Sequence, residues 1–176
     1  MDAESKEGFE EFARARFQQL RALAYVTCGD WQIAEDAVSG VLSRLYLRWE
    51  KVATPDAYAR AAVIRAAIDH KRRPWRRESV VGDAFPDVAV ADPSGDVDER
   101  LRMRAALRQV PPRQRATLVL RFLEGLSVDE VAEVLGCSPG TVKSQTKRGL
   151  DTLRNVLAAD ITERGEDHVV SHRGRA

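Results

Sequence analysis

The sequence has few of the residues that metal centres, disulfide frameworks and thiol chemistry require. It contains two cysteines, Cys28 and Cys137, and three histidines, of which only His70 precedes the C-terminal tail. Two isolated cysteines make no disulfide framework, and no Cys/His spacing matches a zinc site. We therefore expect no metal, no cofactor, a reducing compartment, and cysteines that serve as small buried apolar residues.

Long apolar runs and glycine-rich phosphate loops are missing as well. No apolar stretch reaches the roughly 18 residues of a membrane span. Residues 1–11 are acidic and polar, and lack the basic and apolar parts of a signal peptide. His70 lies in a basic segment, where a catalytic base is not expected. These absences predict a cytoplasmic protein that is not an enzyme, has no small-molecule substrate and does not insert into a membrane.

Aromatic residues are scarce at 6%, yet apolar residues make up 44%, which is enough for a packed core. Ala, Leu, Arg and Glu are abundant, and these residues favour helices. The net charge of +1 hides a segregated pattern. Residues 60–77 hold seven cations and one acid, residues 78–99 hold seven acids and no cation, and residues 100–121 hold seven arginines and no acid.

Apolar periodicity and capping residues predict an all-α protein of two small helical domains. Asp30 is the expected N-cap of a helix over 31–49, and Thr54-Pro55 begins a helix that runs to Arg73. The other predicted helices span 6–27, 97–109, 112–123, a short segment after Ser127, and 139–157. The predicted domains are an N-terminal three-helix domain (1–77), a flexible acidic linker (78–97), a four-helix domain (98–157) and a disordered tail (158–176).

The second domain contains the signature of a helix-turn-helix. Ser127 and Glu130 form a capping box, and Gly136 supplies the positive φ that the turn needs. Ala132, Leu135 and Val142 are suited to the crossing of the two helices. The N-terminal half of the second helix then offers a polar face to a DNA major groove. An αα-hairpin with a basic exposed face is the alternative for this segment. The candidate DNA-binding residues are Thr141, Lys143, Ser144, Gln145, Lys147 and Arg148.

The basic block at 60–77 has two interpretations. Its cations suit phosphate contact, and a tryptophan among cations, Trp75, suits stacking on an unpaired base. A solvated helix face, with Trp75 fixing the helix end to its own domain, accounts for the same pattern. The residues alone leave both open.

The sequence resembles the RNA polymerase sigma factors of the extracytoplasmic-function (ECF) class, in the style of actinobacterial members, over roughly residues 9–157. The C-terminal motifs are Pro111-Pro112-Arg113-Gln114-Arg115, Leu123 to Ala132, Gly140-Thr141-Val142-Lys143-Ser144 and Lys147-Arg148-Gly149. The N-terminal motifs are Gly29-Asp30, Ala34-Glu35-Asp36-Ala37-Val38, Ile68-Asp69-His70 and Arg72-Arg73.

The resemblance implies a sigma factor that directs promoter recognition and melting without catalysing a reaction itself. The last long helix would read the minus-35 element through the six residues named above. The implied partners are promoter DNA, the clamp and flap of core RNA polymerase, and an anti-sigma factor. Residues that would hold the opened minus-10 strand are Tyr58, Arg65, Asp69, Lys71, Arg72 and Arg73. Residues that would meet the polymerase are Glu35, Asp36, Ser39 and Ser43.

Two positions depart from the family pattern. Ser39-Gly40 stands where many members carry Gln-Glu, and Arg65 stands where members often have asparagine. We expect a differently built clamp contact, and strand capture that depends more on charge. Two other hypotheses stay open on the sequence: a stand-alone helix-turn-helix regulator with a dimerisation or sensing domain, and an interaction protein that titrates a partner.

Overall fold

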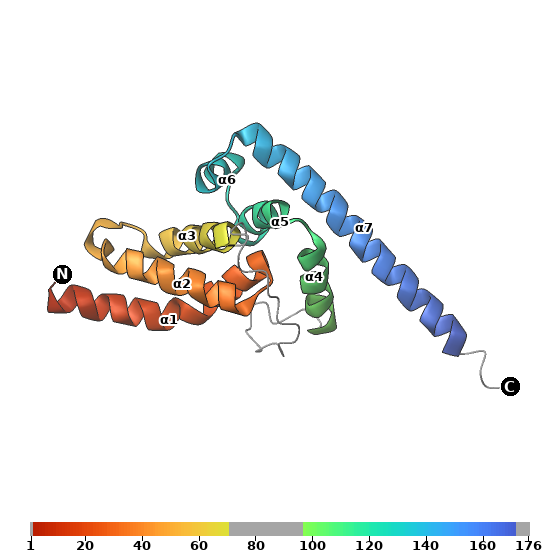
Figure 1. The fold of residues 1–176 in the computed structure, drawn as a ribbon, viewed down its shortest axis with the longest axis horizontal. Coiled ribbons are helices and arrows are strands. Elements are labelled where there is room, and N and C mark those ends of the chain that lie inside the picture. The colour runs from red at the N-terminus through yellow and green to blue at the C-terminus, as the bar shows by residue number, and fades with distance from the viewer. Residues whose placement is uncertain (1, 71–96, 172–176) are drawn as a thin grey trace.

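The computed structural model describes residues 2–70 and 97–171, and every regular element in these two ranges is helical (Figure 1). The predicted all-helical class is confirmed, with a three-helix N-terminal half and a helical C-terminal half. The linker and the candidates Lys71, Arg72 and Arg73 lie outside the described residues. The elements are α1(Ala3–Cys28), α2(Trp31–Tyr46), η1(Trp49–Lys51), α3(Pro55–His70), α4(Val97–Gln109), α5(Pro112–Leu118), η2(Val119–Leu123), α6(Val128–Leu135) and α7(Pro139–Ser171).

Short capping contacts set the boundary between α1 and α2. Gly29 ends α1 with φ 76°, and its N–H donates to the carbonyl oxygen of Tyr25 at 2.7 Å. This left-handed conformation suits glycine because it has no Cβ. Asp30 then begins α2, where its carboxylate accepts from the N–H of Ile33 at 2.9 Å, as predicted. The chain therefore reverses in two residues, and α1 and α2 pack side by side.

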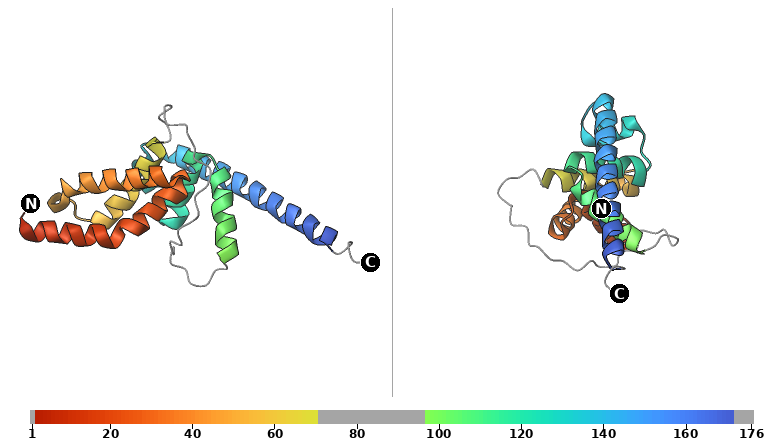
Figure 2. Two further views of the ribbon diagram at one scale, coloured as in Figure 1. Left: turned by 60° about the horizontal axis from the view of Figure 1, so that its bottom comes forward. Right: turned by 90° about the vertical axis from the view of Figure 1, so that its right-hand side faces the viewer.

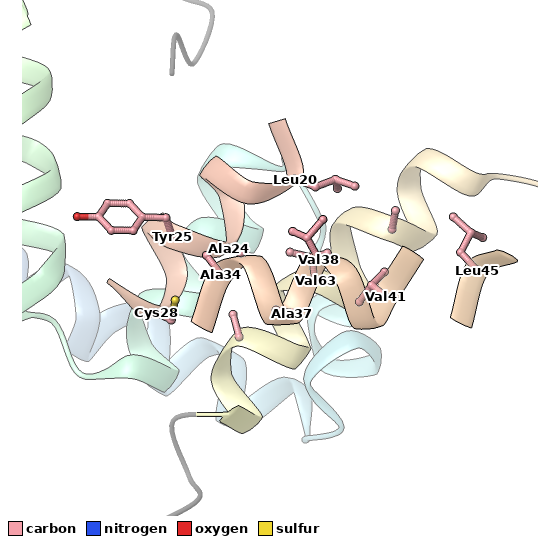
Figure 3. Packing of buried hydrophobic residues seen from close by; sticks show 12 residues of the cluster. Leu20, Ala24, Tyr25, Cys28, Ala34, Ala37, Val38, Val41, Leu45 and Val63 are labelled. Atoms are coloured by element: carbon pink, nitrogen blue, oxygen red, sulfur yellow. The ribbon is translucent and has the colours of Figure 1, made fainter. Parts of the chain in front are cut away.

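The N-terminal core lies between α1, α2 and α3. Figure 3 shows Leu20 of α1, Val38 of α2 and Val63 of α3 pointing toward one another. Small residues at the crossings, such as Ala24, Ala34, Ala37, Ala59 and Ala67, are almost fully buried and let the helices approach closely.

Aromatic contacts close the far end of this bundle. Phe9 of α1 meets Trp49 edge-on with ring centroids 5.4 Å apart, and Phe12 meets the same ring at 5.3 Å. The predicted end of the second helix at Trp49 is wrong, because α2 stops at Tyr46 and Trp49 belongs to the 3₁₀ turn η1. The tighter turn places the indole against α1, where edge-to-face pairs stabilise the packing.

In the C-terminal half, α5 runs into a π-helical turn before the chain enters the helix-turn-helix. The N–H of Glu124 donates to the carbonyl oxygen of Val119 at 3.0 Å, five residues back. Gly125, with φ 68°, then turns the chain toward α6, and Arg121 donates to the Leu126 carbonyl oxygen across this turn.

α7 is longer than predicted. We expected its end near Leu157 and a disordered tail from residue 158, but the helix continues to Ser171. It extends beyond the rest of the molecule toward the C-terminus (Figure 1; Figure 2, left). The segment lacks proline after Pro139, so no residue forces an earlier stop. Gly149 allows α7 to approach α5, since a Cβ there would lie 3.1 Å from Leu118 Cδ1.

A second apolar core joins the two halves, which we had expected to be connected only through the linker. Leu23, Ile64 and Ile68 of the N-terminal half belong to it, and all three are buried. α3 contacts both α5 and α6, and α1 contacts α4 and α5. The members of this second core that come from the C-terminal half are Ala116, Val119, Leu120, Val131, Ala132 and Val142.

Candidate nucleic-acid interface

The helix-turn-helix is built from α6, Gly136 and α7, as the sequence predicted. The Ser127 N–H donates to Glu130 Oε2 at 2.7 Å, and the Glu130 N–H donates to Ser127 Oγ at 3.2 Å, which completes the capping box. Gly136 has φ 60°, and Ser138 Oγ accepts from the N–H of Thr141 at 3.1 Å at the start of α7. Local hydrogen bonds thus fix the beginnings of α6 and α7, and the left-handed Gly136 ends α6.

The crossing of α6 and α7 decides which face of α7 meets solvent. Val142 and Val131 are fully buried, and Ala132 is 6% exposed. With Val142 inward, the neighbouring positions Lys143, Ser144, Lys147 and Arg148 are exposed, whereas Thr141 and Gln145 are half-buried. The structure therefore gathers the cationic candidates on the open side of α7.

The exposed face of the first turns of α7 is positive because no carboxylate there neutralises it. Residues 139–150 contain no acid, and among the described residues no ion pair engages Lys143, Lys147 or Arg148. Helix hydrogen bonds occupy part of the hydroxyl groups, since Ser144 donates to the Thr141 carbonyl oxygen at 2.9 Å. A positive face at the start of the second helix fits a duplex groove.

A cleft of about 590 Å³ lies beside α3 and brings together three of the predicted strand-binding residues, Tyr58, Arg65 and Asp69. Arg44 of α2 also lines this cleft, and we had not predicted it as a site residue. In the sequence, Arg44 is noticeable only as a cation on the polar side of α2. Its place in the cleft depends on how α2 packs against α3. Val134 of α6 also lines this cleft, and it comes from the other half of the chain.

The four residues predicted to meet a protein partner share one exposed face of α2. Glu35 forms an ion pair with Arg21 at 2.7 Å, and Ser43 donates to the Ser39 carbonyl oxygen at 2.8 Å. Asp36 and Ser39 are exposed beside them. Glu35, Ser39 and Ser43 follow one another at four positions, and Asp36 precedes Ser39 by three, so all four lie on one side of the helix.

The described residues hold no cluster of three or more His, Cys, Asp or Glu side chains placed to bind a metal ion. None of the helices in the two described ranges has an apolar stretch long enough to cross a membrane.

Comparison with known proteins assigns each half of the chain to a protein family. The sigma-70 region 2 family model matches residues 12–77, and the sigma-70 region 4 model matches residues 100–153. The RNA polymerase sigma-E factor of Streptomyces avermitilis is 36% identical over 155 residues, covering 85% of this chain and 84% of that protein. The chain belongs to the ECF class of RNA polymerase sigma factors.

Other relatives of this sigma factor come from mycobacteria. The ECF sigma factor SigE of Mycolicibacterium smegmatis is 29% identical over 170 residues, covering 92% of this chain and 66% of that protein. SigM of Mycobacterium tuberculosis is 28% identical over 155 residues, covering 85% and 76%. A crystal structure of the sigma factor RpoE in complex with the anti-sigma factor NepR from Bartonella quintana shares the fold. Its TM-score is 0.63 at 23% identity, and the match covers 88% of this chain and 99% of that one.

The two matches coincide with the two halves of the structure. Region 2 covers most of α1 and all of α2 and α3, and region 4 covers α4 through the first half of α7. This sigma factor promotes transcription initiation by RNA polymerase, binds the polymerase and promoter DNA, and is not itself an enzyme. The stand-alone regulator hypothesis is thereby superseded.

Proposed function

We propose that α7 reads the minus-35 element of the promoter as duplex DNA, through Thr141, Lys143, Ser144, Gln145, Lys147 and Arg148. The observation that carries this proposal is the unpaired positive face at the start of the second helix of the helix-turn-helix. Lysine and arginine side chains can donate to guanine O6 and N7 in the major groove, and serine or glutamine can bind bases or backbone.

The cleft beside α3 holds the opened minus-10 strand in the same proposal. Tyr58 offers an aromatic ring for an unstacked base, while Arg65 and Arg44 offer positive charge to phosphates. Asp69, on the same wall of the cleft, can accept hydrogen bonds from base amino groups. Lys71, Arg72 and Arg73 extend the positive charge beyond α3 along the sequence.

The exposed face of α2 with Glu35, Asp36, Ser39 and Ser43 meets the polymerase clamp, and region 4 meets the flap. We further propose a cytoplasmic protein that an anti-sigma factor regulates. This last point rests on the fold that it shares with the RpoE chain solved together with NepR.

The proposal is tested by transcription with core RNA polymerase from the native source. Sequencing the 5′ ends of transcripts from fragmented genomic DNA defines the promoters. We expect Lys143→Ala with Arg148→Ala to lower output from these promoters at least tenfold, since each base contact contributes about 1–3 kcal/mol.

Arg154→Ala is the matched control, because Arg154 is an exposed arginine on the same helix that pairs with Asp151 instead. Unchanged output from the double variant would rule out α7 as the minus-35 reader.

A further inference from the structure

We infer that Arg21 of α1 is a positioning residue for polymerase binding, because it holds the Glu35 carboxylate in place on the exposed face of α2. Arg21 is itself held by the ring of Trp31. The inference rests on the proposed contact between this face of α2 and the polymerase clamp. It extends the residues that determine this contact from α2 to α1.

The ion pair between Arg21 and Glu35 joins the two neighbouring helices. Arg21 Nη2 lies 2.7 Å from Glu35 Oε1, a short contact between opposite charges. The Arg21 side chain is 17% exposed, whereas the Glu35 side chain is 49% exposed. The cation is therefore mostly enclosed, while its carboxylate partner still faces solvent. An ionised carboxylate has about four acceptor positions, so one contact with Arg21 leaves capacity for a donor on a partner protein.

An aromatic stack fixes the position of the Arg21 guanidinium. Arg21 Cζ lies 4.4 Å from the centroid of the Trp31 ring. The Trp31 ring in turn stacks on the ring of Tyr25, with centroids 3.9 Å apart and an interplanar angle of 10°. Tyr25 is 8% exposed and belongs to the N-terminal core. The guanidinium therefore lies against a ring that is anchored in this core.

Helix spacing brings these side chains together at the start of α2. Asp30 caps α2, and Trp31 is the first residue of the helix. Glu35 follows Trp31 by four positions. On α1, Tyr25 follows Arg21 by the same spacing. Residues four apart lie on one side of a helix, so the two pairs meet where α1 and α2 pack side by side.

Stability alone does not account for an arginine at this place. Arg21 Nε is buried and has no hydrogen-bond partner among the described residues, and the same holds for Trp31 Nε1. Buried donors without a partner cost free energy, and a partly exposed ion pair contributes little. The arrangement does supply a carboxylate in a fixed position. A side chain that is already ordered loses less conformational entropy when a partner binds.

The negative charge of the proposed polymerase face is confined to its N-terminal end, at Glu35 and Asp36. Further along α2, Ser39 and Gly40 offer no charge. The Ser43 hydroxyl donates to the Ser39 carbonyl oxygen at 2.8 Å, so this donor is used within the helix. A cation of the polymerase that meets this face therefore meets it where Arg21 holds Glu35.

The inference is tested by titrating the whole chain onto immobilised core RNA polymerase. Arg21→Met removes the charge and keeps an unbranched apolar stem over the Trp31 ring. Arg16→Met is the matched control, because Arg16 also lies on α1 and pairs across helices with Asp56 of α3 at 3.1 Å. We expect Arg21→Met to weaken binding about fivefold, the cost of ordering one long side chain, and Arg16→Met to match the wild type.

A double-mutant cycle separates positioning from a structural role. In a Glu35→Ala background we expect Arg21→Met to have no further effect on affinity, because Arg21 acts through Glu35. An equal loss in both backgrounds would overturn the inference. Promoter-specific output at saturating sigma factor should stay at the wild-type level in Arg21→Met, since only the affinity for polymerase changes. Circular dichroism and urea denaturation show that each variant is folded.

Trp31→Leu is the second variant, and it removes the ring that holds Arg21 while both charges of the pair remain. We expect it to weaken polymerase binding as well, again only when Glu35 is present. Wild-type affinity in this variant would overturn the role of the ring.

Asp36→Asn tests the proposed polymerase face independently of Arg21, because Asp36 is exposed beside Glu35. Weaker binding by Asp36→Asn together with wild-type affinity in Arg21→Met would overturn the inference and leave the proposed face in place. Wild-type affinity in both Asp36→Asn and Glu35→Ala would overturn the proposed face, and the inference with it.

Discussion

Arg115 Nε donates a 2.7 Å hydrogen bond to the carbonyl oxygen of Thr27, which lies 88 residues earlier in the chain. The same guanidinium reaches the Leu107 carbonyl oxygen within its own half at 3.2 Å. One side chain therefore stabilises the turn between α4 and α5 and also joins region 4 to the end of α1. Burial lowers the pKa of Arg115, but an arginine remains protonated, so its charge stays and needs these three acceptors.

Replacing Arg115 should destabilise the protein even when the charge is kept. Arg115→Lys cannot reach three carbonyl oxygens with one ammonium group, and we expect the free energy of unfolding to fall by about 3 kcal/mol. Urea denaturation measures this change. Arg113→Lys is the control, because Arg113 is exposed on the same helix. A loss of less than about 1 kcal/mol would show that the buried hydrogen bonds contribute little.

Two glycines inside helices should respond to alanine with opposite sign. At Gly40 the nearest atom to an added Cβ is Arg44 Nη1 at 3.6 Å, an ordinary contact. Gly40→Ala should therefore raise the free energy of unfolding by about 0.5–1 kcal/mol, through the higher helix propensity of alanine. At Gly149 a Cβ would meet Leu118 at 3.1 Å, so Gly149→Ala should destabilise the protein. Denaturant unfolding of both variants is the measurement, and an equal effect in both would contradict the packing at Gly149.

The capping box of α6 should give the protein a defined pH dependence. Hydrogen bonds from Ser127 lower the pKa of Glu130, first through the Ser127 side chain and then through its backbone. The folded state therefore favours the ionised carboxylate. Its stabilising contribution is present above the unfolded-state pKa near 4.5 and is lost as pH falls through the lower folded-state pKa.

The measurement is the difference in unfolding free energy between the wild type and Glu130→Gln as a function of pH. We expect this difference to shrink on acidification below the unfolded-state pKa. Glu133→Gln, on the exposed side of the same helix and outside the capping box, is the control. A difference that stays constant with pH would mean that the carboxylate does not act as part of the cap.

The proposed strand-binding cleft predicts a specific salt dependence. Arg65 is exposed at its rim, so Arg65→Ala should remove about one phosphate contact. Binding of single-stranded DNA should weaken, and the slope of log affinity against log salt should become shallower by about 0.7. Arg14→Ala, an exposed arginine on α1 outside the cleft, should leave the slope unchanged. The same slope for wild type and Arg65→Ala would place the strand elsewhere.

Elements defined by contacts between near neighbours were predictable from the sequence. Asp30 caps α2, Ser127 and Glu130 cap α6, and Gly136 turns the chain before α7, all as predicted. Each of these features depends on hydrogen bonds that span three or four residues, and the sequence displays both partners together. The helix-turn-helix and the exposed cations of α7 follow from the same local rules.

Boundaries that depend on distant packing were not predictable in the same way. Trp49 lies in a 3₁₀ turn because Phe9 and Phe12, about forty residues earlier, pack against its indole ring. The extension of α7 to Ser171 is not predictable from composition, because low apolar content is also typical of disordered segments. Arg44 lines the same cleft as Arg65 only because α2 packs against α3.

The sequence by itself determined the helices, their caps, the class of the protein and the cations at the start of α7, because these follow from periodicity, local hydrogen bonding and motif. Only the tertiary structure decided how the halves meet. In the sequence Arg115 is one cation in an arginine-rich block. Leu23, Ile64 and Ile68 are apolar residues, and the sequence does not indicate what they pack against. Their burial against region 4 depends on contacts between residues tens of positions apart, and no local pattern specifies such contacts.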